Sequence, residues 1–142
     1  MHETIDIEAF VVFCKEQGLS VEKYELEIGF MEKSHISILD LPNGIRIDLN
    51  GVYTPWDKGV VEDAEEFDYE GIIIRIAKPE YLIANKLYKG GEIDFEDAFS
   101  VYIQNKDRLD NRLLKTLVYQ LAVEESLEIL LSKVNEIENM NK

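Results

Sequence analysis

Cysteine is almost absent from this chain, in which Cys14 is the single example among 142 residues. One thiol cannot form an internal disulfide, and it cannot supply the several thiolates of a cysteine-based metal cluster. Cys14 also falls in an apolar stripe, so we interpret it as a small buried hydrophobic residue rather than a reactive thiol. Stability must then come from a hydrophobic core, and a chain of this length can bury one as a single domain.

Positive charge is scarce. Lys and Arg number 15 against 29 Asp and Glu, which gives a formal net charge of −14. Non-specific binding of nucleic acid depends on basic side chains that neutralise phosphates, and no local basic patch interrupts the acidic sequence. We therefore expect no non-specific nucleic-acid binding.

Long hydrophobic runs are also absent, because no apolar stretch approaches the length that spans a bilayer. The hydrophobic share of 46% and the charged share of 31% are ordinary for a globular protein. The first residues, Met-His-Glu-Thr-Ile-Asp, lack the basic start and apolar core of a secretory signal. The sequence thus predicts no membrane contact and a cytoplasmic location.

The clearest local signal lies in residues 34–50, where two apolar alternations flank Pro42-Asn43-Gly44. Asn-Gly between alternating hydrophobic residues predicts a β-hairpin. The two-residue period of a strand places Asp48 on the face opposite Ile45, Ile47 and Leu49, which we expect to face the core. A carboxylate there is ordinarily a solvated strand residue.

Helical periodicity predicts most of the other elements. A helix is expected over residues 7–18, and residues 21–31 fit either a strand or, as we favour, a helix with Ser20 as N-cap. Residues 57–67 predict a short surface helix, and residues 71–77 a buried strand. Pro79 begins a helix with Leu82, Ile83 and Leu87 inward. After Gly90-Gly91 comes a helix with a stripe from Phe95 to Ile103, and two leucine-striped helices follow from residue 109 onward.

Lys86 lies on the inward side of the helix that Pro79 begins. A lysine at that position either extends out of the edge of the core or meets an anion, and the local sequence leaves both alternatives open. Asp94 and Asp97 stand three residues apart near the start of the next helix, where the helix dipole favours carboxylates. Helix capping alone is a sufficient explanation for these two acids.

The segment from Ile76 to Leu87, IAKPEYLIANKL, is followed by Asp94-Phe95-Glu96-Asp97-Ala98. Together they resemble the strand, Pro-Glu-x-Leu-Ile-x-x-Lys-Leu and Asp-x-x-Asp signature of nucleotidyltransferase-like proteins of the AbiEii toxin and minimal nucleotidyltransferase type. The resemblance implies an α+β fold, with a mixed β-sheet, flanking helices and a C-terminal helical pair. It also implies one domain over residues 1–142, with an α/β core in residues 1–105 and C-terminal helices in residues 106–142.

In that family a first strand carries Arg-x-Thr-x-Asp-hydrophobic-Asp, and His2-Glu3-Thr4-Ile5-Asp6-Ile7-Glu8 resembles it. The resemblance implies that Asp6 and Glu8 lie on an extended segment and that Asp48 joins them as a third carboxylate. These three residues are then the expected catalytic residues and Mg²⁺ ligands, because Mg²⁺ prefers oxygen ligands and phosphate. The same resemblance implies nucleotide contacts for Thr4, Lys86 and Asp94, with Lys86 contacting either phosphate or a neighbouring acid such as Asp94.

Two functions follow from the resemblance. The first is metal-dependent transfer of an NMP group from an NTP to a hydroxyl of a protein, tRNA or small molecule, in a toxin–antitoxin system. The second is a catalytically inactive nucleotidyltransferase fold that acts as a protein-interaction module, with an antitoxin or a second copy of the chain as partner. The family's Gly-Gly or Gly-Ser turn has no counterpart before Asp6, and Glu8 stands in place of an Asp. We therefore expect either a short or degenerate member of the family or a true start upstream of Met1.

Overall fold

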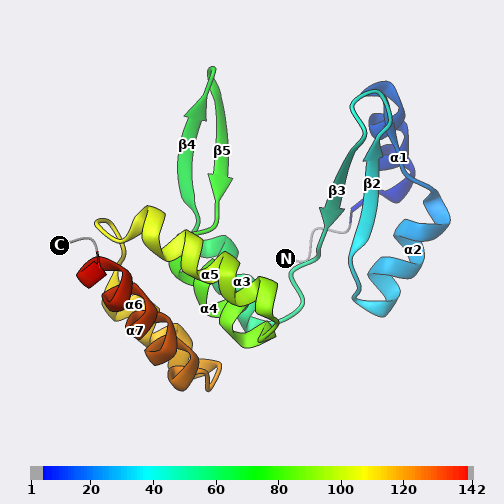
Figure 1. Cartoon of the computed structure of the whole chain (residues 1–142). Coiled ribbons are helices and arrows are strands. Elements are labelled where there is room, and N and C mark those ends of the chain that lie inside the picture. Colours follow the sequence, from blue (N-terminus) through cyan, green and yellow to red (C-terminus); the bar gives the residue numbers. More distant parts are fainter. Residues whose placement is uncertain (1–4, 141–142) are drawn as a thin grey trace. The chain divides into compact units, whose positions relative to one another are not determined.

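The computed structural model describes residues 5–140. This range contains seven helices and two small antiparallel sheets, so the predicted α+β class is confirmed (Figure 1). The chain divides into two compact units, Met1–Lys58 and Gly59–Lys142. The boundary expected after residue 105 falls inside the second unit. Within residues 5–140, no helix is both long enough and apolar enough to cross a membrane.

The first unit packs two helices against one face of a three-stranded sheet. Its elements are α1 (Ile7–Glu16), β1 (Leu19–Ser20), α2 (Lys23–Glu32), β2 (Ile36–Asp40) and β3 (Ile45–Leu49), and the strand order is β1-β2-β3. The core consists of side chains at most 9% exposed: Val11, Cys14, Val21, Leu26, Ile36 and Ile38. The prediction that Cys14 is buried is confirmed, and burial raises the pKa of its thiol.

The β2–β3 hairpin is confirmed, and its register pairs Ile36 with Leu49 and Asp40 with Ile45. Gly44 has φ +66°, a conformation that glycine adopts without steric cost, and its N–H donates to the Asp40 carbonyl over 2.8 Å. The expected core face of β3 is only partly correct. Leu49 packs against the core, whereas Ile45 is 55% and Ile47 43% exposed, because α1 and α2 cover the strand β2 more fully than the edge strand β3.

Residues 21–31, whose sequence fits either the strand or the helix period, are mostly helical. α2 begins after Glu22, and Ser20 belongs to β1 rather than capping the helix. Gly29 explains how α2 approaches the sheet. A Cβ there would lie 2.2 Å from Ile36 Cγ1, so only a glycine lets Ile36 pack directly against the helix backbone.

The second unit contains a hairpin and a group of helices. α3 (Pro55–Glu62) crosses the boundary between the units and is followed by β4 (Glu65–Tyr69), β5 (Ile72–Ile76), α4 (Pro79–Lys89), α5 (Glu92–Asn105), α6 (Asn111–Gln120) and α7 (Glu124–Met140). The helix expected over residues 57–67 is therefore too long, since residues 65–69 pair with β5 in an antiparallel ladder. Residues 72–76 form the predicted strand, but they are exposed rather than buried.

The helices α4 to α7 supply the core of this unit. Ile83 and Leu87 are buried as expected, but Leu82 is 43% exposed, because it lies on the outer side of α4. Ala98 in α5 is fully buried, and the leucine stripes of the two last helices contribute Leu114, Leu117, Leu127 and Leu130. The hairpin β4–β5 projects from these helices (Figure 1).

Candidate functional site

Lys86 lies between two carboxylates in the second unit. Its Nζ is 3.1 Å from Asp94 Oδ1 and 2.6 Å from Asp97 Oδ2. These hydrogen bonds, that of Asp97 first, raise the pKa of Lys86 above its ordinary value of 10.5. Of the two alternatives that the sequence leaves open, Lys86 therefore meets an anion, namely both acids of the next helix.

The turn between α4 and α5 produces this contact. Gly90 adopts φ +72° and ends α4, and Gly91 is the N-cap of α5, so the two helices fold back on each other. The last turn of α4 then faces the first turns of α5. An ammonium group has three N–H donors, and two of them are used here, which leaves Lys86 little capacity for a phosphate.

Glu80, from the same Pro-Glu motif, is buried at 3% exposure. Its Oε1 accepts the backbone N–H of Asp110 over 2.6 Å, directly before α6. Asp110 in turn caps α6 by accepting the N–H groups of Arg112 and Leu113. Glu80 thus fixes the start of α6 relative to α4. The sequence pattern contains Glu80, but periodicity alone does not reveal that an acid in a first turn will be buried.

Asp6 and Glu8 lie at the start of α1 rather than on a strand. Asp6 is the N-cap, and its Oδ1 accepts the Ala9 N–H over 3.1 Å. Glu8 is in the first helical turn and accepts a hydrogen bond from Lys23 Nζ over 2.5 Å. Thr4, the third expected residue of this segment, lies outside the described residues.

Asp48 lies on β3 and is engaged locally. Its carboxylate accepts the hydroxyl of Ser37, directly across the ladder, over 2.9 Å. Arg46 Nε, on the same face of the strand, is 3.2 Å from Asp48 Oδ1. The residue therefore has the local partners of an ordinary cross-strand carboxylate.

The described carboxylates do not form a metal site. In the range 5–140, no three His, Cys, Asp or Glu side chains gather in a group that could hold a metal ion. The structure thus does not bring Asp6, Glu8 and Asp48 together, and this donor arrangement does not fit Mg²⁺, which requires several oxygen ligands at one point.

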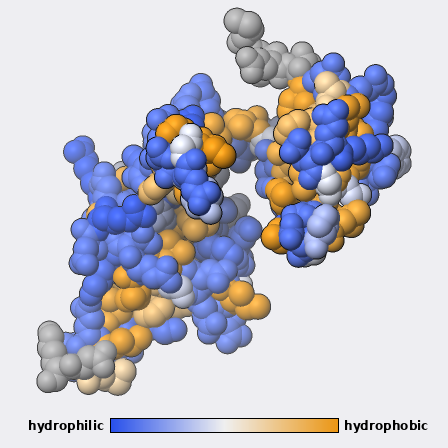
Figure 2. All heavy atoms as spheres, turned by 90° about the horizontal axis from the view of Figure 1, so that it is seen from above, coloured by the Kyte–Doolittle hydropathy of each residue, from blue (hydrophilic) through white to orange (hydrophobic). Residues whose placement is uncertain are grey.

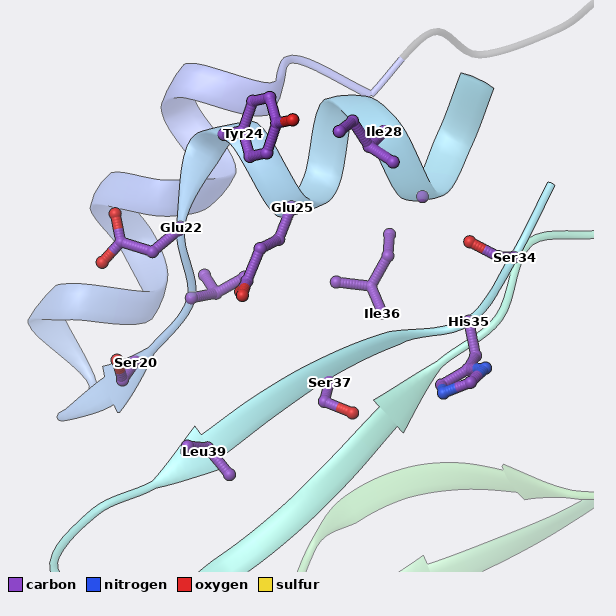
Figure 3. Close-up of a pocket in the computed structure, with 12 residues that line it drawn as sticks. Ser20, Glu22, Tyr24, Glu25, Ile28, Ser34, His35, Ile36, Ser37 and Leu39 are labelled. Carbon is purple, nitrogen blue, oxygen red and sulfur yellow. The ribbon is translucent and has the colours of Figure 1, made fainter. Parts of the chain in front are cut away.

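A groove lies in the first unit between α2 and the edge of β2, with a volume of about 500 Å³. Figure 3 shows Tyr24, Glu25 and Ile28 on the α2 side and Ser37 and Leu39 on the β2 side. β1 pairs with only the last two residues of β2, Leu39 and Asp40. On that side, the rest of β2 faces no strand among the described residues.

An apolar face is exposed on the β4–β5 hairpin. Residues that pair directly across an antiparallel ladder share a face. One face carries Glu65 at its end, opposite Ile76, and five large apolar side chains that are between 39% and 64% exposed: Phe67, Tyr69, Ile72, Ile74 and Ile76. In Figure 2, hydrophobic residues lie at the surface of this hairpin beside hydrophilic ones. The other face carries Glu66 opposite Arg75 and Asp68 opposite Ile73. Neither this face nor the groove was expected from the sequence, because strand periodicity does not tell whether a strand is covered.

Comparison of the chain with protein-family models, curated proteins and solved structures gives no match.

Proposed function

We propose that this protein is an interaction module that binds a partner protein through the apolar face of its β4–β5 hairpin. The observation that carries the proposal is the exposure of five large apolar side chains on one face of a projecting two-stranded hairpin. An isolated hairpin is at best marginally stable in water. A contiguous exposed apolar patch is typical of a surface that binds another protein. A partner that covers this face stabilises both the hairpin and the complex.

Charge indicates which kind of partner fits. β4 and its turn carry Glu65, Glu66, Asp68 and Glu70, against the single Arg75 on β5. Of these acids, Glu65 lies on the apolar face opposite Ile76, and Glu70 lies in the turn at the end of that face. A second copy of the chain would bring these like charges to the same interface, and like charges across an interface cost binding energy. The partner that fits is a basic protein with an apolar patch bordered by Lys and Arg. We propose that this partner is a cytoplasmic, antitoxin-like protein.

The experiment uses two variants of neighbouring isoleucines. Ile74→Thr lies on the apolar face, and Ile73→Thr on the opposite face is the matched control, because both retain a β-branched residue in the strand. Partner capture from a lysate of the source cells is measured with the tagged chain, and the captured protein is then purified for titration. We expect Ile74→Thr to weaken binding about tenfold, since it removes about 1 to 1.5 kcal/mol of apolar burial.

The supporting result is a captured protein of net positive charge whose binding is reduced by Ile74→Thr and retained by Ile73→Thr. Equal loss with both variants, capture of a second copy only, or no captured protein would each contradict the proposal. Size-exclusion chromatography with light scattering identifies self-association separately.

Nucleotidyl transfer is a second candidate function. What supports it is the contact of Lys86 with Asp94 and Asp97, in the order in which the resemblance has these residues. Incubation with Mg²⁺ and each NTP, followed by mass measurement of added protein and tRNA acceptors, tests it. An added mass of one NMP on an acceptor would favour this candidate over the module without activity.

A further inference from the structure

We infer that the groove between α2 and β2 binds an extended peptide segment with basic side chains, which adds as a strand to the free edge of β2. This inference concerns the first unit and is independent of the hairpin proposed above as an interaction surface. It is carried by three features of the groove, which are its shape, its open strand edge and its charge.

The shape suits an extended chain. The groove runs along β2, with Ser20 and Leu39 near one end and Ser34 and His35 near the other (Figure 3). Its volume of about 500 Å³ is in the range of small-ligand and peptide sites. Ile28 and Leu39 give it apolar lining on both sides, which suits alternate side chains of an extended segment.

The strand edge supplies the pairing groups. β1 consists of two residues, and its register ends at Ser20, which pairs with Leu39. The chain then turns away into α2, and within residues 5–140 no strand continues beside Ile36 and Ser37 on that side. A bound segment can therefore continue the ladder in the place where β1 stops. Addition of a strand to an exposed edge is a common mode of peptide recognition.

Charge decides the class of peptide. Glu22 and Glu25 both line the groove, and Figure 3 shows Glu25 pointing from α2 toward β2. Lysine and arginine are not among the lining residues, and the net charge of the whole chain is −14. Tyr24, 69% exposed, adds an aromatic face at the same rim, on which a cationic side chain can stack. An acidic peptide would be repelled, whereas a Lys- or Arg-containing peptide gains at both carboxylates.

The test uses a blocked octapeptide of alternating lysine and valine as the probe. Binding to the full chain is followed by NMR chemical-shift changes of the backbone amides. We expect the largest changes in β2 and α2, in particular at His35, Ser37 and Glu25. A peptide with glutamate in place of lysine, and one with every backbone amide N-methylated, which cannot donate a hydrogen bond to a strand, should each bind at least about tenfold more weakly.

Charge reversal in the protein separates the groove from the general acidity of the chain. The double variant Glu22→Lys/Glu25→Lys should weaken the probe about tenfold, since each reversal removes an attraction and adds a repulsion. Glu32→Lys, an exposed acid of the same helix outside the groove, is the control and should have a much smaller effect.

Several results would overturn the inference: no binding of the lysine–valine probe, shift changes confined to the β4–β5 hairpin, equal binding of the N-methylated probe, or an equal effect of Glu32→Lys. If Ile74→Thr abolishes partner capture while the lysine–valine probe still binds, the groove is a binding site separate from the hairpin. If the probe does not bind while partner capture persists, the inference on the groove is wrong and the proposed function still stands.

Discussion

Glu80 shows at the residue scale how one buried acid joins two helices. Its carboxylate is 3% exposed and accepts the Asp110 N–H, and a hydrogen bond to a charged group contributes about 1.5 to 3 kcal/mol. We therefore expect Glu80→Ala to lower the free energy of unfolding by about 2 kcal/mol, as measured by urea denaturation. Glu80→Gln keeps an acceptor and should cost about 1 kcal/mol. Glu96→Ala, at an exposed acid of α5, is the control, and an equal loss in all three variants would contradict this role.

Lys86 gives a prediction on pH. Its pKa is raised by Asp97 and Asp94 above the value of 10.5 that holds in the unfolded chain. A raised pKa in the folded state means that this stabilisation is fully present below the ordinary pKa and is lost as the pH rises through the raised value. Lys86→Met should therefore unfold at lower urea concentration than the unmodified chain at about pH 8, and the difference between the two should narrow as the pH rises above 10.5.

The matched control for Lys86 is Lys89→Met. Lys89 lies in the same helix, is exposed, and has no ion pair among the described contacts. A difference between the Lys86 variant and the unmodified chain that stays constant over this pH range would show that the variant acts through packing and not through the ion pair.

Sequence reasoning at the residue scale was most accurate where a local pattern determines the contact. The approach of Lys86 to Asp94 was one of the alternatives that the sequence left open, and it depends on a Pro-started helix, two glycines and an acid pair that are all close in sequence. The gathering of Asp6 and Glu8 with Asp48 depends on how distant segments pack, which periodicity does not encode. The structure instead uses Asp6 as the N-cap of α1, and local capping is a short-range effect that the sequence also permits.

At the scale of elements, the β2–β3 hairpin and the long helices were predictable because each has a strong period and a defined turn. Residues 65–69 were not, since Glu65, Glu66 and Asp68 look like a solvated helix face and become a strand only by pairing with β5. The prediction that β5 is buried was also wrong. An unbroken run of Ile is typical of a covered strand, but among residues 5–140 this ladder consists of β4 and β5 alone.

Gly29 sets the distance between the helix α2 and the strand β2. Alanine is favoured over glycine within a helix by about 1 kcal/mol. In Gly29→Ala, however, the new Cβ would approach Ile36 Cγ1 to 2.2 Å, so the helix or the strand must move. We expect a net loss of about 1 to 3 kcal/mol in the free energy of unfolding, measured by urea denaturation.

A double-variant cycle checks the cause. Ile36→Ala removes the atoms that meet the new methyl group, so Gly29→Ala should cost much less in that background than in the unmodified chain. Additive losses would indicate that the glycine acts through backbone conformation rather than through contact with Ile36. A widened spacing in the single variant should also weaken the lysine–valine probe, since Gly29 and Ile36 both line the groove.

For the whole molecule, the resemblance implied the α+β class, and composition indicated that no internal disulfide forms and that no helix among residues 5–140 spans a membrane. It did not predict the division of backbone contacts into Met1–Lys58 and Gly59–Lys142, because contact density depends on tertiary packing. Charge, in contrast, is a property of the whole chain that needs no structure, and both surfaces proposed for binding carry acids that favour a basic partner.

The net charge of −14 also leads to a prediction for the entire molecule. Excess like charge destabilises the compact state, and salt screens this repulsion, with a Debye length of about 10 Å at 0.1 M. The melting temperature should therefore rise by about 5 °C between roughly 0.02 and 0.3 M NaCl, as measured by calorimetry. MgCl₂ at matched ionic strength should give the same rise, because the described residues contain no group of three or more metal-binding side chains. A clearly larger rise with Mg²⁺ would reveal a specific site and would favour nucleotidyl transfer, whereas a fall with NaCl would mean that the ion pairs outweigh the repulsion.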